Sequence, residues 1–364
     1  MMAMHWCISR KASFTSIPLM EADQTGGGYS RVTHSRFPGD SGTRWSISRA
    51  PHLKRWSRVP PATYRVGSVA DRDVSIGIDI GGTKVLGVTV DANAKILDRE
   101  RASSLQDGRR DPGLHISLGV AERLRRRAEE RGEAPLSVGI GVPEYVNEAG
   151  LLTSRLVMEW DVQVLDLFGH LGRVRVESDV RCAAVAESIL GAGRSLTSFL
   201  YVSIGTGISS CLVLDGQPWR GSRGEAIAFG ELVVARSKKG GVVTLEEFAS
   251  GAGMCHRYSE ATGRGVLGAE ELMALAEAGD AEAQDILATS LHALGEALTA
   301  AVDILDPSAL IVGGGLGTSG GFWWDHLSAE YRAGTAKRPG APPLLVSALG
   351  SDAGAIGAAL HAKK

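Results

Sequence analysis

The sequence predicts an α/β protein of two similar lobes, and three observations support this fold class. A β-hairpin occupies residues 74–90 and turns at residues 81–82, where two glycines are adjacent. A second apolar hairpin occupies residues 199–214 and turns at residues 205–207. Each hairpin, about 125 residues from the other, opens a mixed α/β segment. This duplication predicts a cleft between two lobes, where ligands commonly bind.

The remaining elements follow from the spacing of apolar and charged residues. A helix is expected wherever apolar residues recur every three to four positions, and a strand wherever they alternate or run together. In chain order these are a helix at about 114–131, a strand at 136–142, a strand around Val174 and Val176 that leads into an alanine-rich helix at 183–186, two helices at about 269–305, and a strand at 309–312.

The first 72 residues differ from the rest of the chain. Five prolines and a run of three glycines interrupt them, and Lys and Arg outnumber Asp and Glu. This composition predicts a disordered extension, or upstream sequence translated from an early start, with a targeting peptide and a DNA-binding arm as alternatives. The folded part then divides into an N-terminal lobe at 73–185 and a C-terminal lobe at 186–364. The last helix can pack back on the N-terminal lobe.

The composition argues against several classes of function. The chain has 364 residues, 44% of them hydrophobic, and a formal net charge of -2. This balance provides no electrostatic footprint for nucleic acid or an anionic membrane. No apolar run reaches the length of a membrane-spanning helix. The four cysteines are scattered without a CxxC pair, so we expect reduced thiols in a cytoplasmic protein with neither nucleic-acid nor membrane partners.

Several reactive side chains lie in the turn of the first hairpin. Asp79, Gly81, Gly82, Thr83 and Lys84 fall within six consecutive positions. The glycines let backbone N–H groups approach phosphate oxygens, while the Thr and Lys side chains add a hydroxyl and a positive charge. The Asp carboxylate can hold Mg²⁺ directly or through water. A plain hairpin turn requires fewer such residues, so this motif predicts a phosphate site.

Two further glycine motifs follow downstream. The turn of the second hairpin can close on the same phosphates from the opposite lobe, although a plain turn explains it equally well. A glycine run after the strand at 309–312 suits an adenine ring. Residues 315–320 also fit the dinucleotide fingerprint, but they lie too near the C-terminus for a pair of βαβ halves. The nucleotide candidates from these motifs are Gly205, Thr206, Gly207, Gly313, Gly314 and Gly315.

Taken together, these motifs resemble the ROK family, a group of sugar kinases and related repressors. Residues 79–84 are similar to its first phosphate motif, 205–207 to its second, and 306–315 to its adenosine motif. Residues 351–359 are similar to its C-terminal helix signature. The resemblance covers residues 74–364 and implies a two-lobed actin-like ATPase fold, which is ribonuclease H-like and also found in hexokinase, with the active site in the interlobe cleft.

The resemblance also indicates the catalytic base. Phosphoryl transfer to an alcohol needs charge neutralisation, positioning and a carboxylate that accepts the hydroxyl proton. Residues 177–187 are similar to the family segment in which Asn-Asp precedes an alanine-rich helix, and the Asp there is the general base. By this match Asp179 is the base. Helix N-capping is the alternative task for an Asp at a strand-to-helix junction.

The positions that match substrate contacts depart from the family pattern. Glu144 stands where the family has Gly after Gly-Val-Pro, and Ser178 replaces the Asn before the catalytic Asp. The family's Gly-Glu-x-Gly-His segment aligns with residues 227–231, which places Glu231 near the pocket in either alignment register. Glu246 matches a family Glu that contacts sugar hydroxyls, with a solvated residue at a helix start as the alternative. The family's zinc knuckle of three cysteines is absent, so no zinc site is expected.

The resemblance implies a kinase that uses ATP and Mg²⁺ to phosphorylate a primary hydroxyl of a sugar-like polyol. Because unpaired polar groups penalise the wrong substrate, the altered contacts favour an unusual acceptor. We expect a C7-cyclitol such as 2-epi-5-epi-valiolone, with a conventional glucokinase-like hexose kinase as the alternative. A non-catalytic sugar sensor or repressor is the alternative from another class. Family members are often dimeric, so a homodimer is compatible with the sequence, which does not determine the oligomeric state.

Overall fold

The computed structural model describes residues 73–363 except 107–108, 112–113, 159, 161 and 237–239, together with the strand residues 20–22, 29–34 and 45–49. The chain forms two units, Met1–Pro60 and Pro61–Lys364. In the first unit, β1 (Met20–Ala22), β2 (Tyr29–His34) and β3 (Trp45–Arg49) form an antiparallel sheet in that order. The prediction of a disordered or non-native extension falls mostly on residues of 1–72 outside the described ones, and it stays a prediction.

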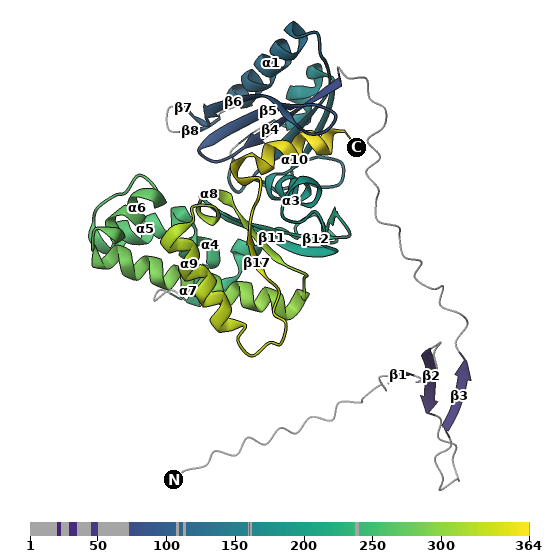
Figure 1. The fold of residues 1–364 in the computed structure, drawn as a ribbon, viewed down its shortest axis with the longest axis vertical. Coiled ribbons are helices and arrows are strands. Elements are labelled where there is room, and N and C mark those ends of the chain that lie inside the picture. The colour runs from purple at the N-terminus through teal and green to yellow at the C-terminus, as the bar shows by residue number, and fades with distance from the viewer. Residues whose placement is uncertain are drawn as a thin grey trace. The chain divides into compact units, whose positions relative to one another are not determined.

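The second unit begins with a lobe built on a five-stranded sheet in the order β10-β9-β4-β5-β6 (Figure 1). β4 and β5 pair antiparallel and form the first predicted hairpin, whereas β9 is parallel to both β4 and β10. The apolar residues of β4 form a nearly continuous buried run, as expected for a strand covered on both faces. The strands and helices of this lobe are β4 (Asp73–Ile80), β5 (Lys84–Val90), β6 (Ile96–Ser103), β7 (Leu105–Gln106), β8 (Arg109–Arg110), α1 (His115–Glu130), β9 (Ala134–Val142), α2 (Val164–Phe168) and β10 (Arg173–Ser178).

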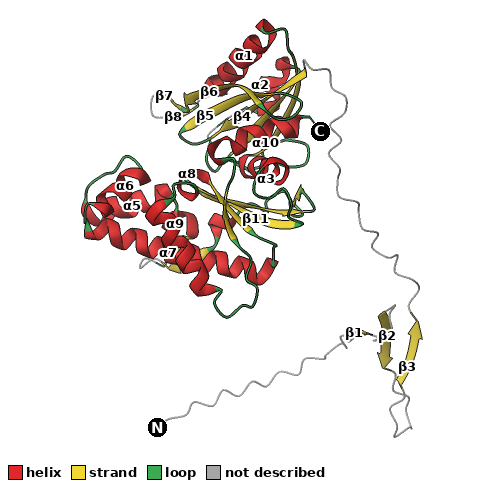
Figure 2. Ribbon diagram, in the orientation of Figure 1, coloured by secondary structure: helices red, strands yellow, loops and turns green. Residues whose placement is uncertain are grey.

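The following lobe contains a second five-stranded sheet in the order β13-β12-β11-β16-β17. β11 and β12 form the second predicted hairpin, and β11, β16 and β17 run parallel to one another. Helices lie against this sheet (Figure 2). α7 carries buried apolar residues at the predicted helical spacing. The elements are α3 (Asp179–Leu190), β11 (Ser198–Ile204), β12 (Ile208–Leu214), β13 (Gln217–Pro218), β14 (Val233–Arg236), β15 (Val242–Thr244), α4 (Leu245–Ala249), α5 (Gly251–Thr262), α6 (Ala269–Glu277), α7 (Ala281–Leu305), β16 (Leu310–Gly313), α8 (Gly314–Gly317), α9 (Gly321–Gly334), β17 (Leu344–Val346) and α10 (Ala353–Ala362).

Helix α10, at the C-terminal end of the described chain, packs against the first sheet and against α3 (Figure 1). Three glycines allow this close approach. A Cβ atom at Gly77 or Gly139 would clash with backbone oxygens of α10, and one at Gly357 would clash with the Cys182 carbonyl. The alanine- and glycine-rich sequence of α10 is therefore needed for backbone packing. Its placement brings the start of α10 next to β4, where the first glycine hairpin begins.

Helix α3 connects the two lobes. It follows β10 directly, and its residues Val180, Ala183 and Ala184 pack in one core with Phe199 and Ile311 of the second sheet. The domain boundary expected after residue 185 falls inside this helix. No helix among the described residues is both long and apolar enough to cross a membrane.

Candidate active site

The first glycine hairpin holds the predicted phosphate motif between β4 and β5. Its turn is closed by the Gly81 N–H, which donates to the Lys84 carbonyl at 2.9 Å. The Thr83 carbonyl accepts a hydrogen bond from the Ser104 N–H at 3.1 Å, which ties the turn to the end of β6. The side chains of Thr83 and Lys84 are exposed. The turn is thus fixed by backbone bonds while its hydroxyl and ammonium groups remain accessible.

Asp79 is the penultimate residue of β4, and glycines surround its carboxylate. A Cβ atom at Gly354 would lie 2.5 Å from Asp79 Oδ2, and one at Gly141 would lie 3.6 Å from Oδ1. Burial raises the pKa of Asp79 to about 6, and the positive charge of Lys84 opposes that rise. The absence of side chains at Gly354 and Gly141 therefore leaves room for the Asp79 carboxylate between β9 and α10.

Asp179 is the first residue of α3 and lies close to Asp79. The N-cap position of this helix is Ser178, not Asp179, and the Ser178 side chain makes no capping hydrogen bond. Asp179 Oδ1 accepts a hydrogen bond from the Val180 N–H at 2.6 Å. Burial, followed by the negative charge of Asp79, raises the pKa of Asp179 to about 7. A carboxylate with a pKa near the working pH suits general base catalysis.

The second glycine hairpin is held from behind by the start of α5. The Gly251 N–H donates to the Gly205 carbonyl at 2.8 Å, and the Ala252 N–H donates to the Thr206 carbonyl at 3.2 Å. A Cβ atom at Gly207 would lie 2.6 Å from the Glu246 carboxylate. The carbonyls of the turn are therefore bound by α5. Glycine is required at position 207 because the Glu246 carboxylate occupies the space of a Cβ atom.

The third glycine motif lies beside the second. β16 runs parallel to β11, with Gly313 paired to Ser203, so the turns that follow these strands meet at one edge of the sheet. A Cβ atom at Gly205 would lie 3.5 Å from the Gly315 nitrogen. Gly314 has a φ of 81°, which favours glycine. The structure thus brings the second and third predicted motifs together.

Tyr201 packs beside the third glycine motif and is affected by the charges of the two aspartates. Its side chain is buried on β11, and a Cβ atom at Gly313 would clash with its hydroxyl. Burial raises the pKa of Tyr201, with smaller contributions from the negative charges of Glu187, Asp79 and Asp179. The charges of Asp79 and Asp179 therefore act on a side chain of β11, the strand that leads into the second glycine turn.

The candidate substrate residues have different environments. Glu144 is buried, and its carboxylate accepts hydrogen bonds from the Ser154 hydroxyl and from three backbone N–H groups at residues 156–158, the latter at 2.8–2.9 Å. These four donors match the acceptor capacity of a carboxylate. The structure therefore gives Glu144 a role in holding this loop, and its contact with a substrate stays a prediction. Ser178 is fully buried next to Asp179.

Glu231 and Glu246 lie in an acidic region around Tyr145. Glu231 is exposed in a 3₁₀ turn, and Glu246 accepts a hydrogen bond from the Ile208 N–H at 2.7 Å. Burial raises the pKa of Glu246, as does the charge of Glu231. Burial and the charges of Glu231, Glu225, Glu246 and Glu144 raise the pKa of Tyr145. The predicted acceptor residues thus surround a tyrosine that the sequence analysis did not identify.

Comparison with known proteins places the chain in a family. A family model described as the ROK family matches residues 75–364. The chain belongs to the ROK family. A glucokinase from Halalkalibacterium halodurans is 26% identical over 309 residues, which cover 78% of this chain and 92% of that protein. The bifunctional enzyme NanE/NanK from Brucella suis is 34% identical over 86% of this chain, and the match spans 57% of that longer enzyme.

The solved structures agree with this assignment. The crystal structure of a ROK family glucokinase from Streptomyces griseus, in complex with glucose and AMPPNP, has a TM-score of 0.66 to this chain at 26% identity. The match covers 80% of this chain and 99% of that one. The predicted two-lobed, actin-like α/β fold is therefore confirmed.

This ROK protein also has a buried ionic network that the sequence analysis missed. Glu177 accepts a hydrogen bond from Arg181 Nε at 2.7 Å and also pairs with Arg220. The spacing of Glu177 and Arg181, four residues apart at a strand-to-helix junction, was the signal available in the sequence. Because Glu177 immediately precedes Ser178 and Asp179, the network supports the backbone that carries the candidate base.

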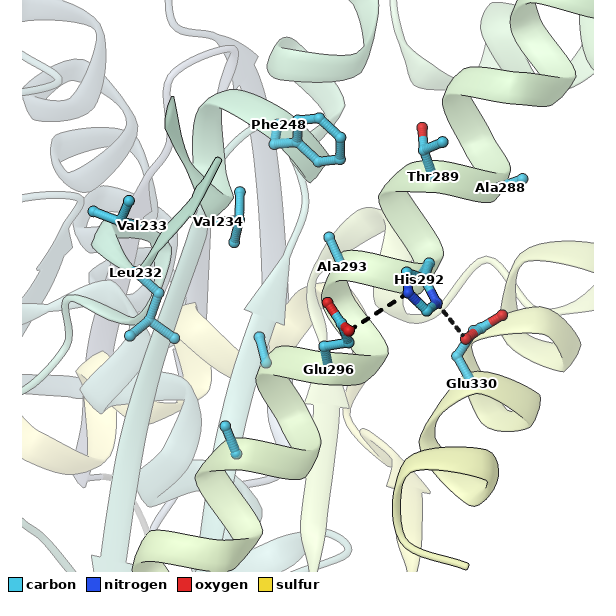
Figure 3. A pocket seen from close by; sticks show the side chains of 12 residues that line it. Leu232, Val233, Val234, Phe248, Ala288, Thr289, His292, Ala293, Glu296 and Glu330 are labelled. Atoms are coloured by element: carbon cyan, nitrogen blue, oxygen red, sulfur yellow. Dashed lines mark hydrogen bonds and ion pairs between the residues drawn. The ribbon is translucent and has the colours of Figure 1, made fainter. Parts of the chain in front are cut away.

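A separate hollow of about 730 Å³ lies on the second lobe (Figure 3). Leu232, Val233, Val234 and Phe248 line one side, and α7 lines the other. His292 contacts Glu330 at 2.8 Å and Glu296 at 3.5 Å on its rim. None of the predicted site residues lines this hollow, so its mostly apolar walls are distinct from the glycine turns and aspartates described above.

Within the described residues, no group of three or more His, Cys, Asp or Glu side chains could hold a metal ion. The family's zinc-knuckle position corresponds here to the β14–β15 hairpin, of which residues 237–239 lie outside the described residues. The expectation that no zinc site exists stays a prediction.

Proposed function

We propose that this ROK protein is an ATP-dependent phosphotransferase that phosphorylates a hydroxyl group of a sugar or sugar-like polyol. The observation that carries the proposal is the pairing of Asp179, whose pKa is raised to about 7, with Asp79 at the end of β4. Named relatives support it, since the compared proteins are described as a glucokinase and a glucose-bound ROK glucokinase with AMPPNP.

The residues of the site divide the work of phosphoryl transfer. Asp179 accepts the proton of the attacking hydroxyl, which makes that oxygen a better nucleophile. Backbone N–H groups of the glycine turns and the Lys84 ammonium bind the phosphate oxygens, where negative charge is concentrated. Asp79 is itself an anion, so it would act on the polyphosphate chain through a bound cation, and it lies close enough to Asp179 to bring that cation near the attacking hydroxyl.

The donor set also fits Mg²⁺. Hard divalent cations prefer carboxylate oxygens, and Asp79 presents a carboxylate beside the phosphate turn with a second carboxylate nearby. Asp79 would hold the ion directly or through water. When bound, Mg²⁺ neutralises charge on the phosphate oxygens.

The acceptor is the finer part of the proposal. We assign a C7-cyclitol such as 2-epi-5-epi-valiolone, phosphorylated on its primary hydroxyl in natural-product biosynthesis. Support comes from Ser178 and Glu231, which stand where the family pattern has Asn and His. The acidic region around Tyr145 favours a neutral, hydroxyl-rich acceptor and disfavours one that is already phosphorylated, because like charges repel.

Two other functions compete with this assignment. A conventional hexose kinase is supported by the names of the relatives, among them the glucokinase from Halalkalibacterium halodurans. A non-catalytic sugar sensor is the candidate from another class, and the presence of Asp79, Lys84 and Asp179 together argues for chemistry instead. The proposal also includes a cytoplasmic location and a homodimeric state. Light scattering of the purified chain would test the oligomeric state.

An acceptor panel tests the proposal. ADP release would be followed with Mg·ATP and glucose, mannose, fructose, N-acetylhexosamines or 2-epi-5-epi-valiolone in turn. We expect release that depends on the acceptor and is highest with the cyclitol. Highest turnover with glucose would replace the cyclitol by the hexose assignment. If a folded protein that binds ATP releases no ADP with any acceptor, the non-catalytic sensor would be favoured.

A further inference from the structure

The most enclosed cation described in the second unit is the guanidinium of Arg181, whose side chain is 0% exposed. Nε donates to Glu177 at 2.7 Å, Nη1 to the Gly224 carbonyl at 2.8 Å and Nη2 to the Val146 carbonyl at 2.8 Å. A buried charge is costly unless it is paired and hydrogen-bonded, and here one carboxylate and two carbonyls meet that requirement. The planar fork of Arg is suited to three partners in different directions.

The two carbonyls belong to loops that border the acidic region around Tyr145. Val146 follows Tyr145 and pairs with Leu152 in an isolated β-bridge. Gly224 precedes Glu225, and its φ of 81° favours glycine. A Cβ atom at Gly224 would lie 2.9 Å from the Val146 carbonyl, so the two loops touch where Arg181 binds them. The guanidinium therefore joins a loop of the first lobe to a loop of the second.

The third partner of Arg181 leads to the candidate base. One oxygen of Glu177 accepts both the Arg181 Nε–H and the Ser178 N–H, the latter at 2.8 Å, and the other oxygen pairs with Arg220. Ser178 is the N-cap of α3, and Asp179 follows it. A single network thus connects the backbone at the base with both loops.

We infer that Arg181 is a positioning residue, which sets the distance between the candidate base Asp179 and the two loops, at Val146 and Gly224, that border the acidic region around Tyr145. This role rests on the proposed kinase function. A misplacement of about 1 Å between reacting groups can cost about 10²-fold in rate, so a network that fixes two loops against the base has a direct effect on turnover.

The nucleotide turns are held by other contacts. Gly205 and Thr206 are bound by the first N–H groups of α5, and Ile208 by Glu246. None of these bonds involves Arg181. A change at Arg181 should therefore act on the acceptor and leave the binding of ATP almost unchanged, whereas a general loss of structure would affect both substrates.

Arg181→Lys in the full chain tests this role, because Lys keeps the charge beside Glu177 but cannot reach both carbonyls as a planar fork. The acceptor would be whichever member of the acceptor panel the wild type turns over fastest. We expect kcat/KM for that acceptor to fall about 10²-fold, with KM for ATP within about twofold of the wild type. Arg257→Lys is the matched control, since Arg257 also makes three hydrogen bonds, to Phe248, Ser290 and Thr289.

Thermal melting would show whether each variant is folded. If Arg181→Lys does not fold, Arg220→Gln replaces it. Arg220 is partly exposed, and its substitution removes only the second partner of Glu177. We expect kcat/KM for the acceptor to fall about tenfold, with no change in KM for ATP. Unchanged acceptor kinetics, or an equal rise of KM for both substrates in a folded variant, would overturn the role of Arg181. Absence of wild-type turnover with every acceptor of the panel would instead overturn the proposed function itself, and this role with it.

Discussion

The two glycine hairpins have the same outline but contribute different chemistry. The β4–β5 turn carries a carboxylate, a hydroxyl and an ammonium group within six residues, and the last two are exposed. The β11–β12 turn has only Thr206 between two glycines, and α5 holds its carbonyls from behind. The two similar hairpins therefore differ in what they offer a ligand. The first turn presents charged and hydroxyl side chains, and the second presents mainly backbone groups.

The surroundings of the two turns show the same division. Near the first turn, burial raises the pKa of Asp79 to about 6 and that of Asp179 to about 7. Near the second turn, close packing dominates, because added Cβ atoms at Gly207 and Gly314 would meet Glu246 and the Ile204 carbonyl. Substitution of the carboxylate of Asp179 should change the chemical step, whereas substitutions in the second turn should change nucleotide binding.

The largest expected effect follows from removing the candidate base at the start of α3. Asp179→Asn keeps the size of the side chain but cannot accept the hydroxyl proton. We expect kcat to fall about 10³-fold, while the Kd for Mg·ATP changes little. Steady-state rates and calorimetric titration with ATP would measure the two quantities. Turnover close to that of the wild type would remove Asp179 as the base and end the contrast between the lobes.

The pH dependence of the same carboxylate gives the next effect. Because the base must be ionised and its folded pKa is about 7, kcat/KM for the acceptor should fall about tenfold for each pH unit below that value. A pH profile between 5 and 9 at saturating ATP would show an acidic limb near 7. A rate that stays flat down to pH 5 would contradict the raised pKa.

A smaller effect is expected from the second lobe. A Cβ at Gly205 meets no protein atom closer than 3.5 Å, so Gly205→Ala should fold normally and yet obstruct a phosphate that approaches the turn. We expect KM for ATP to rise about tenfold, or about 1.4 kcal/mol, with KM for the acceptor unchanged. Gly265→Ala is the matched control, since a Cβ there has open space. An acceptor defect in Gly205→Ala would show that the second turn does not act on the nucleotide alone.

The smallest expected effect concerns stability. The pKa of Asp179 is 3.8 ordinarily and about 7 in the folded chain. The folded state therefore holds this proton more tightly, and stability is lost as the pH rises from about 4 to about 7. Asp179→Asn should melt several degrees above the wild type at pH 8 and close to it at pH 4.

The control for that experiment is a carboxylate whose pKa is shifted in the opposite direction. The pKa of Asp280 is lowered to about 2 by the Ala283 N–H and by Arg264. Its contribution is present above pH 3.8 and is lost as the pH falls. Asp280→Asn should not raise the melting temperature at pH 8. No gain in Asp179→Asn would mean that burial of Asp179 costs the fold nothing. A gain in the control would show that the effect is not specific to a carboxylate with a raised pKa.

The parts of the fold that follow from local pattern were predictable from the sequence. Both hairpins, the helix at 115–130 and the long helix at 281–305 are where apolar spacing and glycine turns indicate them. The pairing of the second and third glycine motifs also follows from strand order, because turns after adjacent parallel strands meet at one edge. Such features depend on neighbours in sequence or on a simple sheet rule.

Features that depend on tertiary contacts were not predictable. Glu144 binds backbone groups 12–14 residues away, so its saturated carboxylate cannot be inferred from the Gly-Val-Pro-Glu sequence. Arg181 meets carbonyls 35 and 43 residues away, in two different lobes. Glu246 is bound to the second hairpin 38 residues before it. Each side chain is ordinary in sequence, and its partner is determined only by how the two sheets and α3 pack.

Phosphorus NMR of the wild-type chain with Mg·ATP and the acceptor it uses best tests the central claim most directly. The account predicts that the γ-phosphate signal of ATP declines while one phosphate monoester signal grows in equal amount, split by the two protons of a primary carbon. Growth of inorganic phosphate alone, or an unchanged ATP spectrum with every acceptor, would contradict phosphoryl transfer to a polyol.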